Sequence, residues 1–157
     1  MDRIDRKILA LLQDDADIAL ADIAERVGLS QTPCWRRIQK LQNEGYILKR
    51  VALLSPEKLN VGVTVFVLIR TNQHNQAWVD RFKAAVLQIP EVVEFYRLSG
   101  QVDYLLRVVV SGINDFDRVY QKLIQNTELY DISSSFAMET IKLTTALPLD
   151  NMALGGE

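Results

Sequence analysis

The chain has 157 residues, 48% hydrophobic and 24% charged, a composition typical of a globular protein with a buried core. This composition excludes a disordered chain, a collagen and an extended low-complexity repeat. The formal net charge of −2 argues at first against a nucleic-acid binder, because affinity for phosphate comes mainly from clustered lysine and arginine.

The charge is distributed unevenly along the chain. Residues 26–50 hold six basic residues and one acidic residue, a net charge of +5, whereas residues 61–157 carry a net charge of −3. A basic segment therefore lies within an acidic protein, and the total charge does not exclude DNA binding.

Cysteine content and hydropathy indicate the compartment. Cys34 is the single cysteine, which suits a reducing environment. The N-terminus alternates charges instead of leading into an apolar signal segment. The longest apolar run, residues 65–69, is far shorter than the roughly 20 residues of a membrane helix. We expect a cytoplasmic protein that does not bind a membrane.

The first 46 residues have apolar positions at helical spacing, and their most informative part is a break near Gly28. Glycine at the end of a helix adopts the left-handed conformation at little cost. The side chain of Leu29 can pack into the core and anchor the turn. Ser30 can cap the next helix through its side chain. Pro33 falls in the first turn of that helix, where its missing N–H costs little. The pattern predicts helix, turn, helix.

The second of these helices has two contrasting faces. A helical wheel places Cys34, Ile38, Leu41 and Gly45 together as the buried face, so Cys34 is expected to be a core residue. The opposite face presents polar groups with one sign of charge, which suits the major groove but also suits simple solvation. Arg37 lies at the flank. The predicted DNA-binding residues are Ser30, Gln31, Thr32, Arg36, Arg37, Gln39, Lys40 and Asn43.

The segment after this helix predicts a strand and then a hinge. Residues 46–53 are typical of a strand that could serve as a wing, where Lys49 and Arg50 either contact phosphate or form an exposed strand end. Turn-forming residues at both ends of residues 54–62 predict a hinge. The expected organisation is a DNA-binding domain at 1–50, a linker at 51–62 and a second domain with a short tail at 63–157.

The second domain alternates strand-like and helix-like segments. Buried strands are predicted near residues 63–69, 92–98 and 104–110, helices near 76–88 and 114–126, and a final strand beyond them. The order βαββαβ is that of a ferredoxin-like fold, with helices on one face of an antiparallel sheet. The expected fold class is α+β.

Four segments carry a resemblance to one protein family. The opening Asp2-Arg3 with residues 4–9, the phrase at 27–47, the Ser99-to-Leu106 loop and residues 138–142 are together similar to the Lrp/AsnC family of transcriptional regulators. The last of these resembles the final strand of the family. The resemblance covers roughly residues 2–148.

The resemblance implies a winged helix-turn-helix joined to a RAM effector domain. It further implies homodimers that assemble into octamers, double-stranded DNA as a partner, and an amino acid effector, with leucine, methionine or another apolar amino acid expected first. No cofactor and no metal site are expected. The implied effector-binding residues are Leu98, Gly100, Val102, Asp103, Ser133 and Ser135.

The chemistry of the loop leaves two alternatives open. Asp103 could accept the ammonium group of an amino acid while backbone amides near Gly100 bind its carboxylate. Alternatively, Gly100 and Asp103 only form a tight turn between two strands.

The expected function is a DNA-binding transcriptional regulator that responds to an amino acid and is not an enzyme. One alternative is an enzyme similar to the haem-pathway decarboxylases that share this architecture, for which His74 is the single histidine. Another is an amino-acid-sensing module that acts on a partner protein.

Overall fold

The computed structural model describes residues 1–73, 75–125 and 130–150. The contacts divide the chain into an N-terminal unit, Met1–Leu53 together with the tail from Lys142, and a sheet unit, Leu54–Ile141. The expected second domain, 63–157, included this tail. In the structure this tail contacts the first helix, as the hydrogen bonds between Gln13 and Leu147 show.

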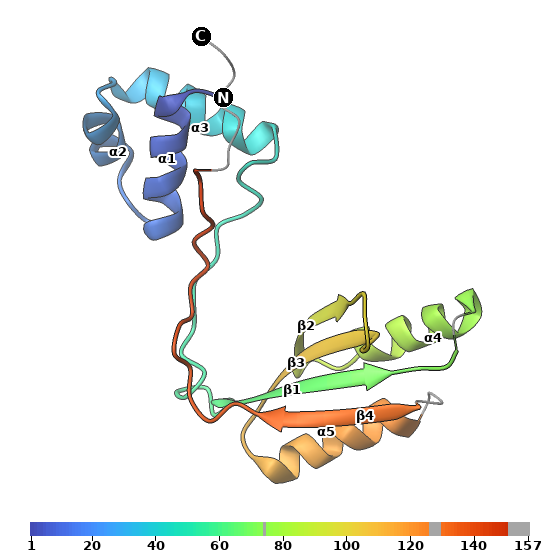
Figure 1. Cartoon of the computed structure of the whole chain (residues 1–157). Helices are drawn as coiled ribbons and strands as arrows, with labels where there is room; N and C mark the ends of the chain where they lie inside the picture. The colour runs from blue at the N-terminus through green and yellow to red at the C-terminus, as the bar shows by residue number, and fades with distance from the viewer. Residues whose placement is uncertain (74, 126–129, 151–157) are drawn as a thin grey trace. The chain divides into compact units, whose positions relative to one another are not determined.

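Three helices form the core of the N-terminal unit (Figure 1): α1 (Arg3–Asp14), α2 (Leu20–Val27) and α3 (Gln31–Asn43). Helix α1 begins with a capping box, in which the Asp2 side chain accepts from the N–H groups of Ile4 and Asp5, and the Asp5 side chain accepts from the N–H of Asp2. Apolar side chains at helical spacing on all three helices meet in one buried cluster, which includes Ile8, Ile23 and Leu41.

The strand predicted for residues 46–53 is not formed. The segment has no regular secondary structure, and Leu48 and Leu53 are exposed. A strand needs hydrogen bonds to a neighbour. Among the described residues of this chain, no strand pairs with residues 46–53. The strand that could serve as a wing is therefore not formed within the described part of this chain.

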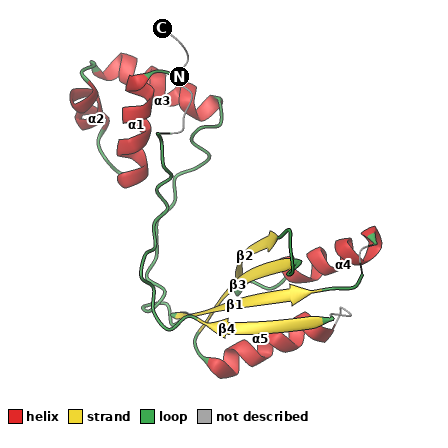
Figure 2. Cartoon of the chain, viewed as in Figure 1, coloured by secondary structure: helices red, strands yellow, loops and turns green. Residues whose placement is uncertain are grey.

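The sheet unit has the predicted βαββαβ order. The sheet is antiparallel with strand order β2-β3-β1-β4, which confirms the ferredoxin-like arrangement (Figure 2). The elements are β1 (Val63–Arg70), α4 (Gln76–Leu87), β2 (Val92–Arg97), β3 (Tyr104–Val110), α5 (Ile113–Gln125) and β4 (Asp131–Phe136). The final strand thus ends at Phe136, and residues 138–142, which resemble the last strand of the family, lie outside it.

The two faces of the sheet differ in what covers them. Side chains alternate along a strand, so Val65, Val67 and Ile69 of β1 pack into the core with α4 and α5, as do alternate residues of β3. The intervening residues lie on the other face, which we call the open face. It contains Thr64, Phe66, Leu68, Tyr96, Leu105, Arg107, Val109, Ser133 and Ser135. No described helix is long and apolar enough to cross a membrane.

Candidate nucleic-acid interface and effector loop

The turn between α2 and α3 forms as the sequence predicts. Gly28 ends α2 in the left-handed conformation with φ +73°, and its N–H donates to the carbonyls of Ala24 and Glu25. Leu29 packs against the helical core. Ser30 lies at the N-cap of α3, but its side chain makes no capping hydrogen bond, which corrects the predicted cap. The turn is therefore stabilised by the Gly28 conformation and by Leu29.

The buried face of α3 is largely the predicted one. Cys34 is completely buried, and Ile38 and Leu41 are 4% and 1% exposed. Burial raises the pKa of the Cys34 thiol, as expected for a core cysteine. Gly45 does not belong to this face, because it follows the end of the helix, is exposed, and has φ +78°. The buried side of α3 is therefore one turn shorter than the helical wheel predicts.

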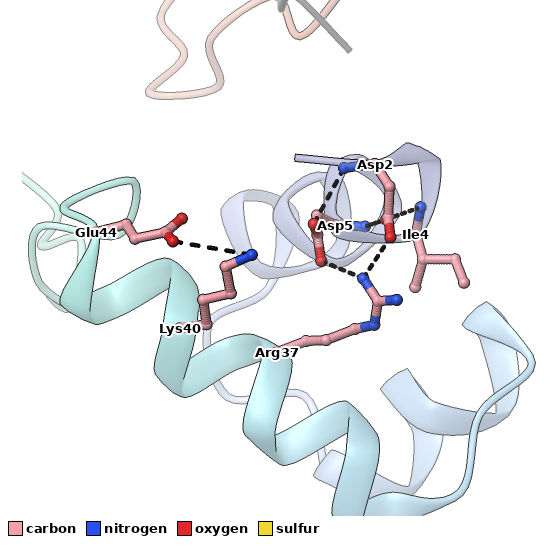
Figure 3. Close-up of polar contacts among 6 residues, drawn as sticks. All are labelled: Asp2, Ile4, Asp5, Arg37, Lys40 and Glu44. Atoms are coloured by element: carbon pink, nitrogen blue, oxygen red, sulfur yellow. Dashed lines mark hydrogen bonds and ion pairs between the residues drawn. The ribbon is translucent and has the colours of Figure 1, made fainter. Parts of the chain in front are cut away.

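The opposite side of α3 is largely exposed and polar, and the charged side chains predicted to read DNA there, Arg36 and Lys40, are basic. Of the predicted DNA-binding residues, Ser30, Gln31, Thr32, Arg36, Lys40 and Asn43 are exposed, and Gln39 is half-buried. The Gln39 amide donates to Gln42 Oε1 at 2.9 Å, and Lys40 Nζ lies 3.8 Å from Glu44 Oε1 (Figure 3). The exposed Lys40 pair is weak, so Lys40 can exchange Glu44 for another anion.

Arg37 has a different environment from Arg36. Its Nη1 lies 2.6 Å from Asp2 Oδ2 and 2.7 Å from Asp5 Oδ1, so one guanidinium bridges two carboxylates at the start of α1 (Figure 3). These hydrogen bonds raise the pKa of Arg37. The pKa of Asp2 is lowered, chiefly by the hydrogen bond from the Asp5 N–H. Burial opposes this shift, and Arg37 adds to it. Arg37 therefore connects α3 to α1.

A shallow depression of about 610 Å³ lies between the start of α1 and the basic side of α3. Its basic wall is formed by Arg36, Arg37 and Lys40 next to Pro33, and its acidic wall by Asp2 and Asp5 beside Met1. Arg37 is already bound to the two carboxylates of the acidic wall, so Arg36 and Lys40 are the cations that a ligand entering the depression meets.

The predicted effector loop joins β2 to β3. The Leu98 N–H donates to the Asp103 carbonyl at 2.8 Å, and Gly100 has φ +127°, a conformation that favours glycine. The N–H of Asp103 donates to the Ile69 carbonyl, and Asp103 Oδ2 accepts from the Thr71 N–H at 2.8 Å. The Asp103 side chain thus fastens the loop to the end of β1 and not to its own turn.

Ser133 and Ser135 are separated from this loop by a strand. Both are exposed on β4, where Ser133 is paired with Leu68 and Ser135 with Phe66 of β1. The structure brings Leu98, Gly100, Val102 and Asp103 into one loop, while the two serines lie across β1 on the open face.

Three residues of these sites were missed by the sequence reasoning. Asp2 and Asp5 form the acidic partner of Arg37, and their spacing of three before an apolar run is the signal of a capping box. Thr71 binds Asp103 through its backbone, for which no sequence signal exists. Among the described residues, no three His, Cys, Asp or Glu side chains gather as a metal site requires. His74 lies outside the described residues.

Two family models match the two units. A winged helix-turn-helix DNA-binding model matches residues 1–47, and the Lrp/AsnC ligand binding domain model matches residues 64–147. The chain belongs to the Lrp/AsnC family.

Relatives in the Lrp/AsnC family match nearly the whole chain. The chain is 47% identical over 151 residues to the DNA-binding transcriptional activator DecR of Escherichia coli (strain K12), covering 96% of this chain and 99% of that protein. A crystal structure of an AsnC family transcriptional regulator from Agrobacterium tumefaciens is 60% identical with a TM-score of 0.93, covering 97% of this chain and 99% of that one.

A third relative was solved with a ligand. The transcriptional regulator NMB0573 from Neisseria meningitidis, in complex with L-Met, is 36% identical with a TM-score of 0.90. The match covers 96% of this chain and 97% of that chain. The family membership predicted from the four sequence segments is thus confirmed, as is the fold of both units.

Proposed function

We propose that the chain regulates transcription by reading double-stranded DNA with α3, under the control of an amino acid bound at the 98–103 loop. The observation that carries the DNA-binding part is the exposed polar face of α3. Its cations are the exposed Arg36 and Lys40, of which Lys40 has only a weak pair with Glu44, so both can bind phosphate or guanine while Arg37 is held by Asp2 and Asp5. The predicted contacts become Ser30, Gln31, Thr32, Arg36, Gln39, Lys40 and Asn43, with Arg37 as a positioning residue.

The DNA-binding role is tested by removing the two cations. Arg36→Ala with Lys40→Ala should weaken binding to the promoter region of the protein's own gene at physiological salt. It should also reduce the slope of log K against log salt by about 0.9 for each lost phosphate contact. Lys83→Ala, an exposed lysine on α4, is the matched control. Unchanged affinity and slope in the double variant would reject DNA reading by α3.

The effector is an apolar amino acid, with leucine and methionine first. Support comes from the L-Met complex of the Neisseria meningitidis relative and from the chemistry of the loop. Asp103 Oδ2 is bonded to the Thr71 N–H, so an ammonium group would bind the remaining oxygen. Backbone amides near Gly100 supply donors for the carboxylate. Leu98, Val102, Ser133 and Ser135 complete the proposed lining, the two serines from across β1 or from a neighbouring subunit.

Asp103→Asn separates the two roles of this side chain. Asparagine keeps an oxygen acceptor for Thr71 but removes the negative charge that would hold an ammonium group. Thermal-shift titration with each of the twenty amino acids should show a stabilising ligand for the native chain, because binding to the folded state alone raises its stability. The variant should keep the melting temperature of the free protein and lose the ligand shift. A full ligand shift in the variant would reject Asp103 as the ammonium site.

Assembly supplies the two recognition helices that a palindromic site requires. We propose that the open face pairs with a second copy to form a homodimer and that dimers assemble further to octamers. The open face exposes Phe66 and Tyr96 by 38% and 50%, beside Leu68 and Leu105. Arg107 pairs there with Glu94 at 2.7 Å, so these two charged side chains of the face neutralise each other. Effector binding changes DNA affinity only to the extent that it favours one assembly.

A further inference from the structure

The tail that follows the sheet unit returns to α1. The Leu147 N–H donates to Gln13 Oε1 at 3.0 Å, and Gln13 Nε2 donates to the Leu147 carbonyl at 3.1 Å. One side-chain amide thus pairs with both polar groups of one backbone residue, as a neighbouring strand would. We infer that α1 carries a docking surface for the chain's own residues 147–150, and that docking gives the N-terminal unit a second tether to the sheet unit.

The contacts on either side of Gln13 are consistent with a defined path along α1. Leu149 is half-buried and packs against the helical core, and Asp150 Oδ1 lies 3.5 Å from Arg6 Nη1. Gln13 and Arg6 are seven residues apart, which places them about 20° apart on the helix and about 10.5 Å apart along its axis. Three extended residues, from Leu147 to Asp150, span about 10 Å. The tail therefore runs antiparallel to α1 over two helical turns.

The three kinds of contact that hold the tail on α1 contribute differently to the stability of docking. The Arg6–Asp150 pair is exposed, with Asp150 94% exposed, so it adds little stability. Leu149 adds apolar burial, and the two hydrogen bonds of Gln13 fix which tail residue faces which turn of α1. Gln13 thus determines the register of the tail along α1, and it is the residue to substitute in a test of docking.

Docking leaves the proposed DNA-reading face open. The described polar contacts of the tail on α1 involve Arg6 and Gln13, whereas Asp5, which binds Arg37, lies about 100° around the helix from Arg6. The chain crosses between the units at residues 53–54 and again at 141–142. The docked residues 147–150 therefore join the chain after β4 to α1, and their described polar contacts do not involve the exposed face of α3.

Hydrogen exchange of the Leu147 amide in the full chain tests the docking directly. In the native protein this N–H should exchange at least tenfold more slowly than in Gln13→Ala. Gln13→Glu, which keeps the acceptor but loses the donor to the Leu147 carbonyl, should lie between them. Lys7→Ala, an exposed change on the same helix, should leave the rate unchanged. Equal exchange rates in the native protein and Gln13→Ala would overturn the docking surface.

The tether has a second test, which rests on the proposed DNA binding. A second connection raises the effective concentration of one recognition helix once its partner is bound. The measured quantity is the affinity for DNA with two binding sites divided by the affinity for DNA with one site. Gln13→Ala should reduce this ratio at least threefold and leave the one-site affinity unchanged. Lys7→Ala is the control. An unchanged ratio would overturn the tether. If the native protein bound neither DNA, the proposed function would fail, and the exchange experiment would still decide the docking.

Discussion

Arg37 Nη1 lies 2.7 Å from Asp5 Oδ1, and Asp5 is the one charged residue that is buried in the described part of the chain, with 4% of its surface exposed. A carboxylate that is removed from water needs a partner to remain charged. This pair joins the first turn of α1 to the middle of α3. Arg36, the neighbouring residue, is exposed. The two adjacent arginines of α3 thus have different roles: Arg37 forms an ion pair within the N-terminal unit, and Arg36 is available to a ligand.

Removing Arg37 should destabilise the N-terminal unit. Arg37→Ala leaves the buried Asp5 carboxylate and the half-exposed Asp2 without their cation, so the free energy of unfolding should fall by about 2 kcal/mol. Urea unfolding followed by helical circular dichroism measures the change. Arg36→Ala is the matched control, and we expect a change within about 0.5 kcal/mol. Equal losses in both variants would contradict the assignment of Arg37 as the link between α1 and α3.

Acid should weaken the N-terminal unit through Asp2. The pKa of this carboxyl is lowered by the hydrogen bond from the Asp5 N–H and by Arg37, so the folded state favours the charged form. A lowered pKa stabilises the folded state above the unfolded value of about 3.9, and this stabilisation is lost as the pH falls through the folded-state pKa.

The variant Asp2→Asn isolates this effect, because asparagine still caps a helix but does not ionise in this range. Its melting temperature should fall less steeply than that of the native protein between about pH 5 and pH 2. Asp14→Asn, an exposed acidic residue of the same helix, serves as the control. Identical melting curves against pH for the native protein and Asp2→Asn would refute the prediction.

Glycine should be required at position 28 because of its backbone conformation and not because a side chain would be crowded there. A Cβ atom added there would meet no atom within 4 Å, but φ is +73°. Gly28→Ala should therefore cost about 1 kcal/mol of stability from the left-handed conformation alone. Gly112→Ala, where a Cβ also meets nothing and φ is not in that region, should be nearly neutral. Differential scanning calorimetry compares them, and a neutral Gly28→Ala would argue against a strained turn.

The open face should determine the oligomeric state. Phe66→Glu places a charge among the exposed apolar residues of this face and should shift sedimentation toward a monomer. Leu87→Glu, on α4 and 74% exposed, tests whether any added glutamate has this effect. A Phe66→Glu protein that sediments as the native one does would place the interface elsewhere.

Periodicity and turn chemistry are sufficient to predict most of the fold. The predicted strand at 104–110 coincides with β3, and the predicted helix at 76–88 differs from α4 by one residue. Both are long segments with regular burial. The predictions failed where an extended segment depends on a partner, as at residues 46–53 and 138–142. β propensity alone does not form a strand when no neighbouring strand is available.

In the candidate sites too, features set by local sequence could be predicted, and contacts between distant residues could not. The exposed face of α3 could be predicted because helical geometry is local. The pairing of Arg37 with Asp5, 32 residues away, and of Gln13 with Leu147, 134 residues away, could not be predicted, because neither spacing reflects a local rule. Ser30 illustrates the remaining failure, since a residue suited to capping occupies the N-cap without forming the bond.

The bridge from Arg37 to Asp2 and Asp5 bears on how relatives of this chain diverge. Regulators that acquire new operators must change the side chains that meet bases, and position 36 is free to change because its neighbours do not depend on it. Position 37 is bound to two acidic positions 32 and 35 residues earlier. These three positions should therefore change together or not at all, whatever DNA sequence each descendant recognises.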